Sequence, residues 1–140
     1  MEWSSSKDQT QKGGQLETWP PFCFLVTWHD CLMFAAQFIF TPGTYDEEFH
    51  ELDQSIDNFA QSLEGFRGVD KWVSPDGTRQ NSIYYWADRE SLSEFSSFPD
   101  HLTAKKRYPE WYDSYQVIIS EVVAQYGDGG ENHPLTSVKS

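Results

Sequence analysis

The change of hydrophobic period between Phe34 and Leu63 restricts the possible folds of this chain more than any other feature of its sequence. The apolar run from Phe34 to Phe40 stops at Thr41-Pro42-Gly43, which is typical of a buried strand closed by a turn. Thr44 and Glu47 then have the spacing of a capping box. Beyond it, apolar residues recur at steps of three and four, which predicts a helix with one apolar stripe: Phe49, Leu52, Ile56, Phe59 and Leu63.

The rest of the chain continues to alternate between strand and helix patterns. In order, these are a strand at 69–73, a turn at 75–78, a strand at 81–86, a helix capped by Asp88, a further helix that starts at Pro99, a break at Pro109 and a strand at 115–123. The order β-α-β-β-α-β predicts an α+β, ferredoxin-like fold. We assign this domain to residues 33–126.

The two flanking segments lack such patterns. We expect residues 1–32 to be an N-terminal extension that is disordered or loosely packed, and residues 127–140 to be a disordered tail, because both are poor in periodic apolar residues. Met33 stands directly before the first strand. We therefore expect the domain to fold from Met33 onward and residues 1–32 to be dispensable.

The charge of the chain excludes some classes of partner. Ten basic residues face 22 acidic ones, and the formal net charge is −12. The one basic run, Lys105 to Arg107, is flanked by acidic residues, so neither a nucleic acid nor an anionic membrane surface is an expected partner.

The apolar stretch at residues 21–40 does not read as a membrane span. His29 and Asp30 lie in its middle, where ionisable groups are costly in a bilayer. Cys23 and Cys31 are the only cysteines, and they form neither a zinc motif nor a disulfide framework. We expect a protein of a reducing compartment, the cytoplasm.

Five short motifs, in this order and spacing, resemble the antibiotic biosynthesis monooxygenase (ABM) domain family over roughly residues 33–126. They are Phe34-x6-Thr41-Pro42-Gly43, Leu63-Glu64-Gly65-Phe66-x-Gly68, Tyr85-Trp86-x-Asp88-x-Glu90-Ser91-Leu92-x2-Phe95, His101-Leu102-x-Ala104-Lys105 and Trp111-Tyr112-x2-Tyr115-x5-Glu121-Val122-Val123. The resemblance implies a homodimer that forms a dimeric α+β barrel. Some members of the family oxidise aromatic polyketides with O₂ and no metal or flavin, and others bind and degrade haem.

The haem-degrading branch places an asparagine, a tryptophan and a histidine at positions that fall here on Ala36, Phe95 and Lys105. None of these residues matches. His101 lies one helical turn before Lys105 and would replace the missing ligand only if the helix shifted. Haem binding or degradation is therefore the least favoured reading of the resemblance.

His101 is the candidate catalytic residue, because a histidine near neutral pKa serves as a base or a hydrogen-bond donor. The alternative is an ordinary histidine on the helix surface or in the core. Aromatic and amide side chains supply the candidate substrate-binding residues: Gln37, Trp72, Tyr84, Trp86 and Phe95. Alternation puts Tyr84 and Trp86 on one face of their strand and Tyr85 on the other, and it leaves open which face meets the helices.

One further helix face carries Asp46, His50, Asp53 and Asp57, which we interpret as a solvated surface and not as a metal site. The sequence thus favours a cofactor-independent monooxygenase of the ABM type that acts on a small aromatic or quinol-like substrate. The alternative from a different class is a non-catalytic dimeric module that binds or senses a ligand.

Overall fold

The structure is a computed structural model that describes residues 33–136. Its elements are β1 (Met33–Pro42), α2 (Glu47–Ser62), β2 (Phe66–Val73), β3 (Gln80–Trp86), α3 (Arg89–Ser97), α4 (Pro99–Arg107), the 3₁₀ turn η4 (Tyr108–Glu110) and β4 (Tyr112–Val122). The strands form one antiparallel sheet in the order β2-β3-β1-β4. The predicted ferredoxin-like α+β fold is confirmed.

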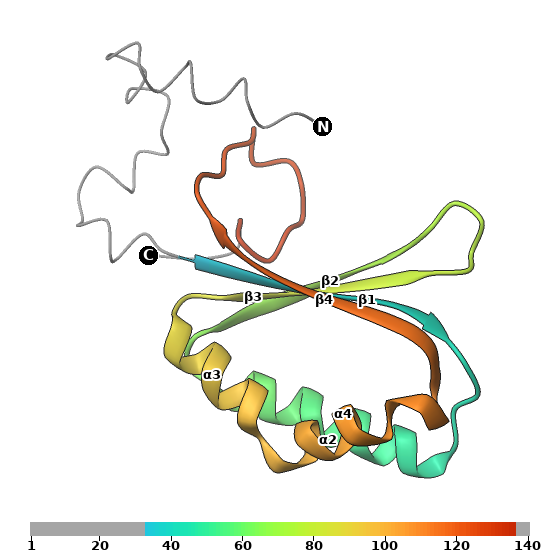
Figure 1. Ribbon diagram of the computed structural model, residues 1–140. Coiled ribbons are helices and arrows are strands. Elements are labelled where there is room, and N and C mark those ends of the chain that lie inside the picture. Colours follow the sequence, from blue (N-terminus) through green and yellow to red (C-terminus); the bar gives the residue numbers. More distant parts are fainter. Residues whose placement is uncertain (1–32, 137–140) are drawn as a thin grey trace.

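Within residues 33–136, the helices α2, α3 and α4 all cover one face of the sheet (Figure 1). The core between the two layers is built on Phe34, Trp86, Leu92 and Phe95 with Ala60 of α2. From the predicted apolar stripe, Ile56, Phe59 and Leu63 pack against this core. The helical spacing of the stripe is therefore what fixes α2 onto the sheet.

The helix caps differ in one place from the sequence prediction. Asp88 caps α3 as predicted, because its carboxylate accepts the backbone N–H of Ser91 at 2.6 Å. The predicted capping box at Thr44 is wrong, since the N-cap of α2 is Asp46, whose side chain accepts the N–H of Phe49 at 2.8 Å. Asp46 also accepts the indole N–H of Trp111, a long-range partner that sequence spacing does not reveal.

The pairing of the strands decides the faces of the sheet. Tyr84 and Trp86 point toward the helices, where both contact Phe95. Tyr85 therefore points to the opposite face, which we call the open face. Gln37 shares the open face, because its amide oxygen accepts a hydrogen bond from Asn81 at 3.0 Å, two positions along β3 from the residue it pairs with.

β4 lies at one edge of the sheet, and most of its side chains are exposed. It begins at Tyr112, three residues before the predicted start, and all but its two end residues are exposed. Val117 and Ile119 are 46% and 54% exposed on the helix side, and Ile118 is 42% exposed on the open face. An apolar edge strand of this kind is a surface for association.

Residues 127–136 turn back over the open face (Figure 1). The sequence pattern predicted no packed structure after residue 126, whereas here Leu135 is only 6% exposed and His133 contacts Tyr85. The expectations for residues 1–32 and 137–140 lie outside the described residues.

Candidate functional site

The predicted site residues fall on two sides of the sheet. Tyr84, Trp86, Phe95 and His101 form a continuous aromatic group on the helix side, with ring centroids 5.6 Å apart for Tyr84 and Phe95, 5.0 Å for Trp86 and Phe95, and 4.6 Å for Phe95 and His101. Gln37 and Trp72 lie on the open face. The sheet separates the two groups, so one chain does not bring all six predicted residues into a single site.

His101 is held as a neutral imidazole. Its Nδ1 lies 3.0 Å from the carbonyl oxygen of Phe95, and because a carbonyl only accepts, Nδ1 carries the proton. Burial lowers the pKa of His101 and Lys105 lowers it further, against the opposing effect of the bond to Phe95. The remaining nitrogen, Nε2, is therefore a lone-pair acceptor at neutral pH.

Trp86 and Phe95 belong to the core and not to an accessible surface. Trp86 is 0% exposed and Phe95 is 6% exposed. The indole Nε1 of Trp86 is a buried donor without a partner in the described part of the chain. Only a movement of the core would bring a ligand against these two rings.

A second group of titratable side chains adjoins the first through Tyr84 and is linked by electrostatic interactions. Asp53 of α2 interacts electrostatically with Lys71 of β2, with Tyr84 of β3 and with Tyr112 of β4. We call Asp53, Tyr84 and Tyr112 the carboxylate–tyrosine site. Within residues 33–136, no hydrogen bond engages the carboxylate of Asp53 or either of the two hydroxyls.

The electrostatics of this site set distinct roles for its members. Burial raises the pKa of Asp53, although the side chain still reaches solvent, and Asp57 raises that pKa further against the opposing effect of Lys71. Burial, followed by Asp53 and Asp57, raises the pKa of Tyr84 to about 12. Burial also raises the pKa of Tyr112. Both phenols therefore remain neutral donors, while Asp53 is an accessible carboxylate with increased basicity.

Aromatic rings surround Tyr112, the member of the carboxylate–tyrosine site at the start of β4. Phe38 stands edge-on to Tyr112 at 5.3 Å, and Tyr45 and Phe49 each lie 5.8 Å from the same ring. Apolar walls around a few polar groups are the usual surroundings of an aromatic ligand.

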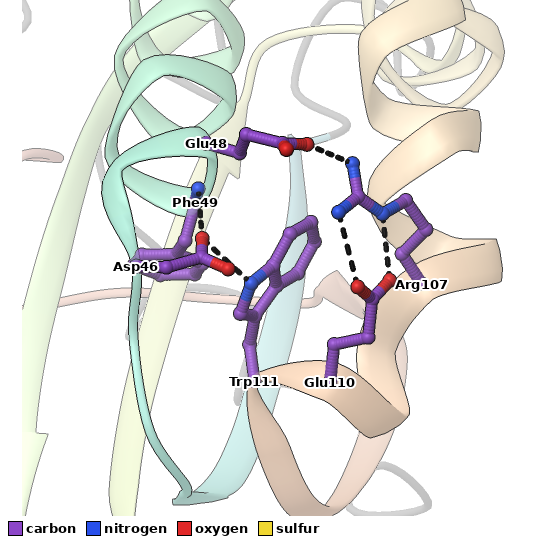
Figure 2. Close-up of polar contacts among 6 residues, drawn as sticks. All are labelled: Asp46, Glu48, Phe49, Arg107, Glu110 and Trp111. Carbon is purple, nitrogen blue, oxygen red and sulfur yellow. Dashed lines mark hydrogen bonds and ion pairs between the residues drawn. The ribbon is translucent and has the colours of Figure 1, made fainter.

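A polar clamp fixes the N-terminus of α2 against the turn that leads into β4 (Figure 2). Asp46 accepts the indole N–H of Trp111 at 3.0 Å, and Arg107 pairs with Glu110 through two bonds of 2.6 and 3.0 Å and with Glu48. The guanidinium also lies 4.7 Å from the Trp111 ring. Since Asp53 follows on α2 and Tyr112 follows Trp111, the clamp sets the distance between them.

Sequence reasoning missed Asp53 and Tyr112. It interpreted Asp53 as one of several solvated acidic residues, and it placed Tyr112 only in the last family motif. In the structure, Trp111 and Tyr112 pack against Phe49 of α2, at 5.6 and 5.8 Å. The one usable signal was the position of Asp53 one turn after Phe49, at the border of the apolar stripe.

Two observations bear on metals and membranes. In the described residues, no three histidine, cysteine or acidic side chains are arranged to hold a metal ion. Between Met33 and Thr136, no helix has the length and apolar character needed to cross a bilayer.

Comparison with known proteins supports the fold. No protein-family model matches the chain, and no curated protein matches it. Solved structures do match. Rv0793 from Mycobacterium tuberculosis is 18% identical, with a TM-score of 0.52, over 69% of this chain and 98% of its own. A Nitrosomonas europaea protein described as a candidate antibiotic biosynthesis monooxygenase is 14% identical, with a TM-score of 0.53, over 73% of this chain and 100% of its own.

A third match has a described activity. SnoaB from Streptomyces nogalater, a cofactor-independent oxygenase, is 14% identical in a point-mutant form, with a TM-score of 0.51, over 69% of this chain and 96% of its own. The chain shares the fold of these proteins. The resemblance to ABM proteins is thus confirmed in structure, and at such identities it concerns the fold alone.

Proposed function

We propose that this protein is a cofactor-independent oxygenase that acts on a small aromatic or quinol-like substrate at the carboxylate–tyrosine site. The observation that carries the proposal is the electrostatic interaction of Asp53, an accessible carboxylate with a raised pKa, with two neutral tyrosines whose hydroxyls make no hydrogen bond in the described structure. The likeness of the fold to SnoaB supports the same reaction class.

The proposed chemistry needs only a base, two donors and dioxygen. Asp53 takes a proton from an activated C–H of the substrate, and Tyr84 and Tyr112 donate hydrogen bonds to the oxygen on which the negative charge collects. The carbanion carbon forms a bond to O₂, and the proton returns to give a hydroperoxide. The same carbon keeps a second hydrogen, and loss of that hydrogen with the outer OH as water leaves a carbonyl, so one oxygen atom of O₂ stays on the oxidised carbon and the other leaves as water.

His101 remains the alternative base. Its Nε2 is a lone-pair acceptor, and its ring joins the site through Phe95 and Tyr84. Its lowered pKa, however, makes the imidazole a weaker base than an ordinary histidine. We therefore assign His101 the positioning of Phe95 and, through it, of Tyr84.

We further propose that the protein acts as a homodimer. Trp72 and Ile118 on the open face are 61% and 42% exposed, and Val117 and Ile119 of β4 are exposed on the other side of the same edge. Apolar surface in this amount calls for a partner, and a second copy of the sheet is the partner of matching shape.

Dioxygen uptake with a panel of anthrones, naphthols and hydroquinones tests the oxygenase proposal. The expected result is uptake above the rate without protein for at least one compound, with a ring-oxygenated product and no added metal or flavin. Ligand binding without uptake, seen for example as quenching of tryptophan fluorescence, would contradict it.

Binding without uptake would instead support the alternative, a non-catalytic ligand-binding module. The separation of Gln37 from His101 by the sheet and the complete burial of Trp86 favour that alternative, because neither residue is then available to a reaction beside His101.

A further inference from the structure

Residues 131–136, which we call the strap, are anchored to the open face by polar contacts. The Nε2 atom of His133 lies 3.0 Å from a carboxylate oxygen of Asp70 and 3.2 Å from the hydroxyl of Tyr85. The backbone N–H of Leu135 donates to Nδ1 of His133 at 3.1 Å, so Nδ1 is an acceptor and Nε2 carries the proton that points to Asp70. The ring of His133 also stands edge-on to Tyr85 at 4.8 Å.

The surface of the sheet is shaped to receive the strap. β2 has a register shift between Phe66 and Gly68, and Gly68 has a φ of +132°, a conformation that favours glycine. A Cβ atom at this position would lie 2.9 Å from Cβ of Pro134. The missing side chain therefore makes the recess that Pro134 occupies, and Leu135 beside it is only 6% exposed.

The strap covers only part of the open face. Asp70 and Trp72 are successive residues of β2 on this face. His133 contacts Asp70, whereas Trp72 is 61% exposed. Ile118 of β4 is also on this face and is 42% exposed. The strap and the uncovered apolar residues thus share the one surface that a second copy of the chain would use.

We propose that the strap competes with a second copy of this chain for the open face, so that release of the strap strengthens self-association. The proposal rests on the homodimer part of the proposed function. Residues 123–130 tether the strap to β4, which keeps its local concentration high and favours rebinding. Because each of two copies must release its own strap before the sheets meet, the cost of release enters the dimerisation equilibrium twice.

Leu135→Ser tests the competition without changing the sheet. The substitution removes the buried apolar contact of the strap, and Tyr126→Ser is the matched control, because Tyr126 lies in the same arm and is 89% exposed. Hydrogen exchange at the amide of residue 135, which donates to His133, reports whether the strap is released. Sedimentation equilibrium over a range of concentrations reports the dissociation constant of the dimer.

The expected result is faster exchange at residue 135 and a dimer that is at least roughly tenfold tighter for Leu135→Ser, since a buried leucine accounts for an order of magnitude or more in a docking equilibrium. Tyr126→Ser should match the unchanged chain. An equal or weaker dimer after release of the strap would overturn the competition while leaving the homodimer intact. A monomer in every variant at every concentration would overturn the homodimer and the competition together.

Discussion

At the scale of single residues, position in the fold separates acidic side chains that look equivalent in the sequence. Asp46 caps α2, Asp57 accepts a bond from Gln61 on the same helix, and Asp53 interacts electrostatically with Tyr84 and Tyr112. Sequence periodicity places Asp53 beside the apolar stripe. It could not identify the partners of Asp53, because Tyr84 and Tyr112 come from strands far along the chain.

We expect Asp53→Asn to leave stability at pH 7 unchanged or to increase it. The folded-state pKa of Asp53 is raised, so the folded protein binds the proton more tightly than the unfolded chain, and stability falls as pH rises from 3.8 through the raised value. Asparagine has no titrating carboxyl, so the substitution removes this loss of stability. Thermal melts between pH 4 and pH 8 measure the effect.

Asp76 provides a control of opposite sign. Hydrogen bonds from Ser74 and Thr78 lower its pKa to about 2, so its contribution to stability is present above pH 3.8 and is lost as pH falls toward 2. Asp76→Asn should lower the melting temperature at pH 7. A clear loss of stability at pH 7 in Asp53→Asn would contradict the assigned raised pKa.

Tyr84→Phe removes one of the two proposed donors and keeps the ring. We expect a hydroxyl-bearing aromatic ligand to bind more weakly by about 1.5–3 kcal/mol if it binds as an anion, because that is the usual contribution of a hydrogen bond to a charged group. Titration calorimetry at pH values above and below the ligand's own pKa measures this. Equal loss for the neutral and anionic forms would argue against a donor role.

At the scale of elements, the strands and helices follow from the hydrophobic period, whereas the contacts that join them do not. The hydrophobic period predicted the position of α2, and the capping residue Asp88 predicted the start of α3. Both signals depend on neighbours within a few residues. The clamp of Figure 2 joins Asp46 to Trp111 and Arg107 to Glu48, pairs whose members lie far apart in the sequence. Local spacing carries no information on such pairs.

We expect Asp46→Ala to destabilise the domain and Asp46→Asn to have little effect. Alanine removes both the N-cap acceptor for Phe49 and the partner of the buried Trp111 indole, and loss of a cap alone costs about 1 kcal/mol. In a domain of this size that cost lowers the melting temperature by roughly 4–8 °C. Asparagine keeps an oxygen at the same position. Equal melting temperatures for the two variants would show that the clamp is not needed.

At the scale of the whole molecule, the sequence predicted the fold and left the two faces of the sheet undecided. The predicted order of strands and helices is the order that the structure shows, because strand–helix alternation constrains topology strongly. Both rows of β3 are aromatic, so alternation did not tell which row met the helices. The split of the predicted site, with Gln37 and Trp72 on the open face, follows from that ambiguity.

The homodimer is the prediction that belongs to this scale. Light scattering at micromolar concentration should give a mass of twice the 16.2 kDa chain. Ile118→Lys should reduce the dimer, because it places a charge on an apolar part of the open face that is 42% exposed and outside the core. A single-chain mass for the unchanged protein throughout the concentration range would count against the arrangement.

The central claim is that the Asp53 carboxylate takes the proton of the substrate, and the pH dependence of turnover in two matched variants tests it most directly. Asp53→Asn and Asp57→Asn each remove one negative charge from α2, and Asp57 is one of the groups that raise the pKa of Asp53. For a substrate that the dioxygen panel identifies, Asp53→Asn should lower kcat by about 10²–10⁴-fold, the usual contribution of a positioned base. Asp57→Asn should keep its turnover and shift the acid limb of kcat/KM to lower pH, because the pKa of Asp53 then falls. Full activity in Asp53→Asn, or an acid limb that stays in place in Asp57→Asn, would contradict the account.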